Sequence, residues 1–280
     1  MAITAKQVSE LRKMTGSPMM DCKKVLTEAE GDMEKAVQLL RERGQAKAAK
    51  RVGNETTEGR VFCKVNEEGT FGSIVKLTCE TEPVTNTDQF ITFGDKITEM
   101  VFSGKSEDLK GDTFAEELTE IRASLGENIT LQDSTTLSGD LVSFYVHSNK
   151  KVGVLVELEL ADKSKNTDEK IVDLAKNLTL QIASLNPRSI SSDDLDPEFV
   201  AGEIEIIKNH LKEDPKNKNK PDNILDMIVE GRKGKIFAEF CLLEQEYVKE
   251  KMQIKELIEN VGKEVGTDVS VKKFVRYNIG

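Results

Sequence analysis

The feature that most constrains the fold of this chain is an internal repeat in its middle. The segment Gly72–Leu77 (GSIVKL) resembles Gly153–Leu158 (GVLVEL), and Asn86-Thr87-Asp88 recurs as Asn166-Thr167-Asp168. In both copies the triplet precedes an apolar periodic segment, where Asn and Thr favour helix capping and Asp favours the positive end of the helix dipole. The repeat therefore predicts two related α+β subdomains, each a small antiparallel sheet packed by helices.

The first copy begins with a predicted hairpin, because apolar and polar residues alternate over 61–65 and 72–79 around a turn at 66–69. A helix is expected over 88–102, another opening with a Thr113/Glu116 capping box, and a third strand from Ile129. The second copy predicts strands over 141–146 and 152–160 and a helix over 168–185. After an interruption it resumes with a helix over 254–261 and a closing strand over 269–277.

The interruption is predicted to be a helical hairpin. Phe199–Leu211 and Ile224–Cys241 have helical character, and the polar segment Lys212–Asp222 between them contains two prolines. We interpret this segment as the tip of a projecting hairpin. The tip is either simply solvated or serves dimerisation.

The N-terminal segment predicts three short helices between Thr4 and Arg43. Thr4 and Gln7 fit a capping box, Ser17 and Pro18 suit the N-cap and first position of the second helix, and Asp32 caps the third. A unit of this size has a marginal core on its own. The following segment, 45–60, lacks apolar periodicity and is predicted to be a linker.

Two positions in this N-terminal region have alternative interpretations. Met19 and Met20 either fill the core or form a soft protein-contact surface, and one of them must point outward because helix neighbours do not share a face. Lys47, Lys50 and Arg51 are interpreted as a solvated helix end in preference to a nucleic-acid patch.

Charge and composition disfavour several functional classes. With 40 Lys and Arg against 50 Asp and Glu, the net charge is −10, which opposes binding to nucleic acids and to anionic membranes. No segment approaches the ~20 apolar residues of a transmembrane helix, and the first twelve residues lack the apolar stretch of a signal peptide. Four separated cysteines indicate reduced cytosolic thiols, and two histidines without a Cys/His cluster disfavour zinc.

The sequence also lacks common catalytic motifs. We find no phosphate-binding loop, no dinucleotide-binding GxGxxG after a strand, and no nucleophile elbow. His147 ends a predicted strand at a hairpin turn, where it is either a solvated turn residue or a contact residue. These observations favour a binding protein that is not an enzyme and carries no cofactor or metal.

Seven segments together resemble one family, bacterial elongation factor Ts. They are Leu11–Lys24, Gly31–Ala36, Leu39–Gly44, Val146–Val156, Leu185–Arg188, Cys241–Gln245 and Phe274–Arg276. They occur in order over nearly the whole chain. The resemblance implies a cytoplasmic guanine nucleotide exchange factor of translation elongation. It would bind elongation factor Tu, disturb that protein's Mg²⁺ and nucleotide site, and release GDP so that GTP can bind.

The resemblance also implies a domain organisation. Residues 1–52 would form a ubiquitin-associated-like helical domain with the start of the linker, and residues 53–139 the first core subdomain. The second core subdomain would comprise 140–186 and 229–263, interrupted by a protruding coiled-coil hairpin at 187–228. Residues 264–280 would form a C-terminal module.

By this resemblance, eight residues are expected to contact elongation factor Tu: Met19, Met20, Asp21, Thr81, Glu82, Pro83, Val84 and His147. The family usually has Thr-Asp-Phe-Val where this chain has Thr81–Val84. Pro83 therefore replaces an aromatic residue that wedges into the partner, and the wedge is either weaker here or supplied by another group. In the repeat, His147 corresponds to Asn66.

The expected partner is elongation factor Tu, with no direct nucleic-acid or membrane contact and with a possible homodimer or heterotetramer through the hairpin. Two other functional classes agree less well with the sequence. A general adaptor would use only the N-terminal helices, which the long matched core argues against. A holdase-like chaperone would need a large apolar groove, which the polar hairpin tip does not support.

Overall fold

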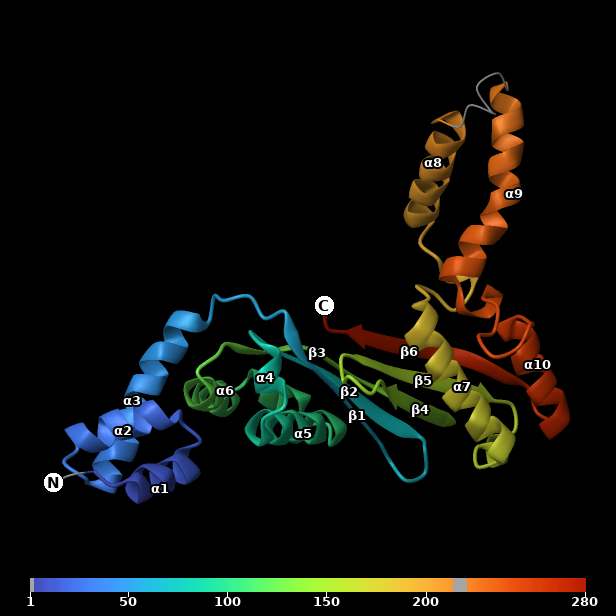
Figure 1. Cartoon of the computed structure of the whole chain (residues 1–280). Helices are drawn as coiled ribbons and strands as arrows, with labels where there is room; N and C mark the ends of the chain where they lie inside the picture. The colour runs from blue at the N-terminus through green and yellow to red at the C-terminus, as the bar shows by residue number, and fades with distance from the viewer. Residues whose placement is uncertain (1–2, 214–220) are drawn as a thin grey trace.

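The computed structural model describes residues 3–213 and 221–280, which form an α+β fold (Figure 1). Its helices are α1 (Ala5–Thr15), α2 (Met19–Glu28), α3 (Met33–Arg51), α4 (Glu82–Thr85), α5 (Asp88–Phe102), α6 (Asp112–Leu125), α7 (Glu169–Leu185), α8 (Pro197–Glu213), α9 (Asp222–Phe240) and α10 (Ile254–Val265). Its strands are β1 (Glu58–Val65), β2 (Phe71–Cys79), β3 (Ile129–Ser138), β4 (Leu141–Val146), β5 (Val152–Leu160) and β6 (Val269–Asn278).

The strands form two antiparallel three-stranded sheets with the orders β1-β2-β3 and β4-β5-β6, which confirms the predicted α+β class. The central strands carry a register shift at equivalent positions of the repeat, between Lys76 and Leu77 in β2 and between Glu157 and Leu158 in β5. A bulge of this kind bends and twists the strand locally. The sequence repeat is therefore also a repeat of backbone geometry.

Each sheet has one face covered by helices. Helices α5 and α6 cover the first sheet around Phe90, Ile97 and Phe114, and α7 and α10 cover the second around Leu174 and Ile258. The other faces of the two sheets pack against each other through a buried cluster consisting of Val61, Ile74, Leu137, Val142, Leu155 and Ile279. The two subdomains thus have separate cores and are joined by a third hydrophobic cluster between their sheets.

The N-terminal helices pack around their own small core and against α6. Leu11, Cys22 and Leu26 are fully buried inside this unit. Helix α3 continues to Arg51, so the prediction of a linker from residue 45 was wrong, and only residues 52–57 separate α3 from β1. The physical reason is that Gly44 is buried where α3 meets α6, and a Cβ there would lie 2.8 Å from the Cβ of Ala123. Small residues at such a close helix contact do not produce the periodic pattern of large apolar residues that predicts a helix.

The residues that cap the helix starts agree with the prediction at two helices and differ from it at two others. The Thr4/Gln7 capping box and the Asp32 cap are confirmed. Helix α2 begins at Met19 with Pro18 at the N-cap, so Ser17 is not the cap. Helix α6 begins after Gly111, so the predicted Thr113/Glu116 capping box is wrong. Pro18, the residue after Ser17, and Gly111, two residues before Thr113, occupy the cap positions.

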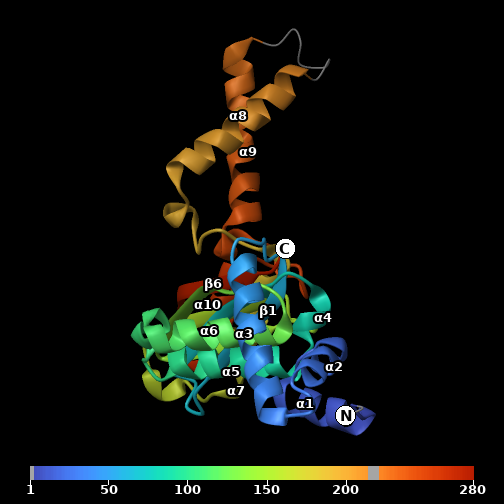
Figure 2. The ribbon, with the colours of Figure 1, turned by 90° about the vertical axis from the view of Figure 1, so that its left-hand side faces the viewer.

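Helices α8 and α9 project from the second sheet as a pair (Figures 1 and 2). Leu211 and Val229 are buried between them. At the base, the rings of Phe199 and Phe240 meet edge to face at 4.9 Å, and the Arg188 guanidinium lies 4.1 Å above the Phe199 ring. The predicted tip at 212–222 lies mostly outside the described residues.

Strand β6 pairs with β5 from Val269 to Asn278, so residues 264–280 complete the second sheet. Helix α9 crosses residue 228, where the sequence analysis placed a domain boundary. Within 3–213 and 221–280, no helix has both the length and the apolar character needed to cross a membrane.

Candidate functional site

The expected contact residues lie in three segments that the fold brings to one side of the molecule: the start of α2, helix α4, and the β4–β5 turn. Figure 2 shows α2 and α4 on the same side. Gly126 lines a cavity of about 250 Å³ together with Pro18 and Asp21 of the α2 start. Its neighbour Glu127 hydrogen-bonds Thr81 at the start of α4. The α6–β3 junction thus connects the first two segments.

The third segment joins α4 through Lys151. The Lys151 ammonium lies 2.6 Å from the Glu58 carboxylate at the start of β1. The contact that the Lys151 ammonium donates to the Glu58 carboxylate raises the pKa of Lys151, and the charge of Glu82 on α4 adds to this effect. In addition, the Val61 amide donates to the Lys150 carbonyl at 2.8 Å. The β4–β5 turn is therefore fixed beside β1 and near α4.

Met19 and Met20 are both exposed, at 52% and 72%. This excludes the core interpretation for both residues, because Cys22, Val25 and Leu26 supply the buried face of α2. Met14, which precedes the α1–α2 turn, is also exposed at 67% and was not singled out from the sequence. Exposed thioether side chains around one turn form an adaptable apolar surface.

Asp21 lies beside the methionines in the first turn of α2, and its carboxylate is 3.0 Å from the ammonium of Lys47 on α3. The pair is exposed, so its contribution to stability is small. It nevertheless leaves an acidic side chain at the edge of the methionine surface.

Residues 81–84 contain the start of a single helical turn, α4. Thr81 is the N-cap of α4, and Pro83 occupies the first turn, where its missing N–H has no helical partner to lose. Thr81, Glu82 and Pro83 are exposed, whereas Val84 packs against the core of the first subdomain. Three of the four residues therefore face solvent and the fourth anchors the turn.

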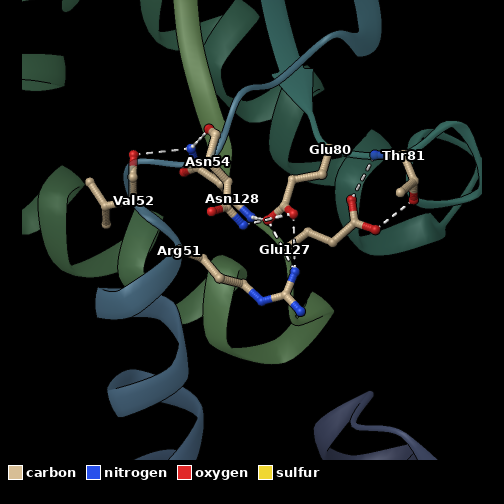
Figure 3. Close-up of polar contacts among 7 residues, drawn as sticks. All are labelled: Arg51, Val52, Asn54, Glu80, Thr81, Glu127 and Asn128. Atoms are coloured by element: carbon tan, nitrogen blue, oxygen red, sulfur yellow. Dashed lines mark hydrogen bonds and ion pairs between the residues drawn. The ribbon is translucent and has the colours of Figure 1, made fainter.

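Two carboxylates that the sequence analysis missed hold α4 in place (Figure 3). Glu127 accepts hydrogen bonds from the Thr81 amide at 3.0 Å and from the Thr81 hydroxyl at 2.5 Å. Glu80 accepts a hydrogen bond from the Asn128 amide at 2.6 Å. Both acids stand at junctions between elements, where periodicity gives no signal. The only signal in the sequence for either acid was that Glu80 directly precedes Thr81, an expected contact residue.

Glu80 also binds the end of α3. Its carboxylate accepts from Arg51 at 3.1 Å and from the Asn54 side chain at 2.9 Å. Burial acts to raise the pKa of the Glu80 carboxyl, but the three hydrogen-bond donors around it outweigh this effect. The net pKa is lowered from its ordinary value of 4.5, so the group is charged at neutral pH.

His147 is exposed in the turn after β4, and its Nδ1 lies 2.7 Å from the Tyr145 hydroxyl. Its counterpart in the repeat, Asn66, has a different role. The Asn66 side chain accepts from the amides of Thr70 and Phe71, both at 2.8 Å, and closes its own hairpin turn. Of the two equivalent turns, the one with His147 is available for an external contact, with Tyr145 beside it.

The thiols of this chain are poorly suited to chemistry. Burial raises the pKa of Cys63 and of Cys79 to about 12, so both are protonated at neutral pH. In the described part of the chain, no group of three or more His, Cys, Asp or Glu side chains could hold a metal ion. What the three segments present is a mixed surface of methionines, acids, a proline and a histidine. Such a surface suits contact with a protein.

A sequence model of the family described as elongation factor TS matches residues 80–280. The chain is 39% identical to elongation factor Ts of Clostridioides difficile (strain 630), over 99% of this chain and 93% of that protein. It is 39% identical to elongation factor Ts of Nitratidesulfovibrio vulgaris (strain DP4), over 100% and 96%. It is 40% identical to elongation factor Ts of Clostridium perfringens (strain SM101 / Type A), over 99% and 93%.

Proposed function

The chain belongs to the elongation factor Ts family, and on this premise we propose that it is a guanine nucleotide exchange factor for elongation factor Tu. In this role it binds the GDP form of its partner and disturbs the partner's Mg²⁺ and nucleotide site. It thereby promotes GDP release, so that GTP binds during translation elongation. The observation that carries the proposal is that α2 and α4 lie on one side of the molecule (Figure 2), with the β4–β5 turn held beside β1 and near α4.

Thermodynamic linkage sets the size of interface that this function needs. A protein that binds the nucleotide-free partner more tightly than the GDP form must weaken GDP binding by the same factor. Nanomolar nucleotide binding corresponds to about 12 kcal/mol, so the differential contact must supply several kcal/mol. A single loop is too small for this, whereas a surface formed by three segments provides several separate contacts.

The residues have distinct proposed roles. Met19 and Met20 provide the adaptable apolar contact, with Asp21 at its edge. Helix α4 presents Glu82 and Pro83 towards the partner's Mg²⁺ site, with Thr81 and Val84 fixing the turn. His147 contacts the partner from the β4–β5 turn. This chain itself uses no metal, cofactor or covalent step.

The proposal also covers the type of each domain, the oligomeric state and the place of action. The α1–α3 unit acts as a ubiquitin-associated-like domain and the α8–α9 pair as a coiled coil, through which a homodimer or heterotetramer forms. The domain limits expected from the sequence belong to the proposal too, except that those after residues 228 and 263 fall inside α9 and α10 and move to the ends of these helices. The net charge of −10 supports a protein that meets RNA only through its partner. Its place of action is the cytoplasm, where translation occurs.

The proposal is tested by release of a fluorescent GDP analogue from purified elongation factor Tu in the presence of excess unlabelled GDP. We expect micromolar concentrations of this protein to accelerate release in a saturable manner. Chelation of Mg²⁺ in a parallel reaction checks that the analogue can leave the site. A release rate that stays at its spontaneous value over the whole concentration range would refute the proposed function.

A further inference from the structure

We infer that Glu80 and Glu127 are positioning residues that together hold α4 in the orientation it needs to act on the partner. The inference rests on the proposed function, because it assigns a task to side chains that lie behind the contact surface. It concerns the carboxylate cluster between the β2–α4 and α6–β3 junctions (Figure 3).

The cluster is reciprocal. Glu80 accepts the amide N–H of Asn128, and Glu127, the residue before Asn128, accepts the amide N–H of Thr81, the residue after Glu80. Each chain segment therefore supplies one carboxylate acceptor and one backbone N–H donor. Hydrogen bonds to an ionised acceptor are stronger than neutral ones. Two of them in opposite directions fix the separation of the segments and also their relative rotation.

Helix α4 depends on this external support. It has four residues, and a single turn is unstable by itself because helix nucleation is unfavourable. Thr81 occupies the N-cap, but its hydroxyl makes no capping bond within α4 and instead donates to Glu127 at 2.5 Å. The direction in which α4 leaves β2 is thus set by a carboxylate from a different part of the chain.

The same cluster holds the end of the N-terminal unit. Arg51 at the end of α3 binds Glu80, and the Asn128 side chain donates to the carbonyls of Val52 at 3.2 Å and Asn54 at 2.8 Å. The exit of α3 and the start of α4 therefore share one set of bonds. Through α3, the position of the methionine surface on α2 is tied to the position of α4.

The cluster is separate from the hydrophobic cores. Helix α4 contributes Val84 to the core of the first subdomain, while the main contacts of that core come from β2, α5 and α6. Loss of the Glu127 bonds should therefore leave the fold intact and change the order of α4. A purely structural role would instead lower stability without a selective effect on the partner.

The test compares Glu127→Gln with Glu117→Gln in the full-length protein. Gln at 127 keeps one carbonyl acceptor but loses the charge and the second acceptor. Glu117 lies on α6, the helix that precedes Glu127, and its carboxylate pairs with Lys96 of α5 at 2.6 Å. Thermal unfolding of both variants checks that the fold is retained.

Two measurements follow. The first is amide hydrogen exchange over residues 81–86 in the free protein, where we expect faster exchange in Glu127→Gln and wild-type exchange in Glu117→Gln. The second is fluorescent-GDP release as a function of concentration. We expect the maximal release rate of Glu127→Gln to fall by about three- to tenfold, with the half-saturating concentration changed by less than about twofold.

The outcomes separate the two proposals. If the wild-type protein does not accelerate release, the proposed function fails, while the amide exchange still reports whether the cluster orders α4. If the wild type is active and Glu127→Gln matches Glu117→Gln in amide exchange and in maximal rate, the positioning role is overturned. A rise in half-saturating concentration with an unchanged maximal rate would also overturn it, because that pattern indicates lost binding only.

Discussion

Gly153 of β5 lies against Val61 of β1 across the interface between the two sheets, so closely that a Cβ on Gly153 would be 2.3 Å from the Val61 Cγ1. Val61 is 2% exposed and belongs to the cluster that joins the sheets. The absence of a side chain at Gly153 therefore sets how closely the two subdomains approach. It also sets the position of the β4–β5 turn, which is bonded to Val61 through Lys150.

We expect Gly153→Ala to destabilise the protein by about 1–3 kcal/mol, the usual cost of inserting a methyl group into a well-packed core. Urea unfolding measures this change. Gly234→Ala is the matched control, because Gly234 lies within α9 with nothing within 4 Å of its Cβ position. There the same substitution should stabilise by about 0.5–1 kcal/mol through helix propensity. Equal effects at the two positions would contradict the close sheet contact.

Met19→Ala combined with Met20→Ala should leave stability almost unchanged, since both side chains are exposed. If they form the contact surface, the half-saturating concentration in GDP release should rise about fivefold or more, as when interface residues worth over 1 kcal/mol are truncated. Val248→Ala, at another apolar residue that is 49% exposed, serves as control. An unchanged half-saturating concentration in the double variant would remove the methionines from the interface.

Glu80 gives a pH dependence of definite sign. Its pKa is lowered by folding, so its contribution to stability is fully present above the unfolded value of 4.5 and is lost as the pH falls through the lower folded value. We expect Glu80→Gln to destabilise the protein at pH 7. Below about pH 4.5, the difference in unfolding free energy between the variant and the wild type should become smaller. Urea midpoints at several pH values measure this. The exposed Glu107, paired with Lys110, provides a control substitution to Gln.

The repeat made much of the core predictable, because alternating residues at 72–79 and 152–160 and helical periodicity at 88–102 are local signals. Two elements were missed for a common reason. The second half of α3 is specified by Gly44 packing on Ala123, and α4 is specified by hydrogen bonds to Glu127. In both cases the determining partner lies far away in the sequence.

The candidate site shows the same limit. The residues expected from the family pattern could be named in advance, but the exposure of both Met19 and Met20 depends on which face of α2 the core takes. The roles of Glu80 and Glu127 depend on contacts between segments that are far apart in the sequence. A single sequence contains no local signal for these.

Pro83→Phe tests whether α4 acts as a wedge. Pro83 is exposed, so a phenyl ring fits without disturbing the core, and loss of the proline ring should cost at most about 1 kcal/mol through the unfolded chain. A large apolar ring can fill a partner pocket that a proline cannot, and such anchors contribute about 2 kcal/mol or more. We therefore expect a severalfold faster maximal release of GDP. Pro83→Ala removes the proline without adding the aromatic ring, so it should release GDP no faster than wild type. Equal maximal rates in the Phe and Ala variants would mean that α4 acts through Glu82 and its backbone, with no pocket for a ring at position 83.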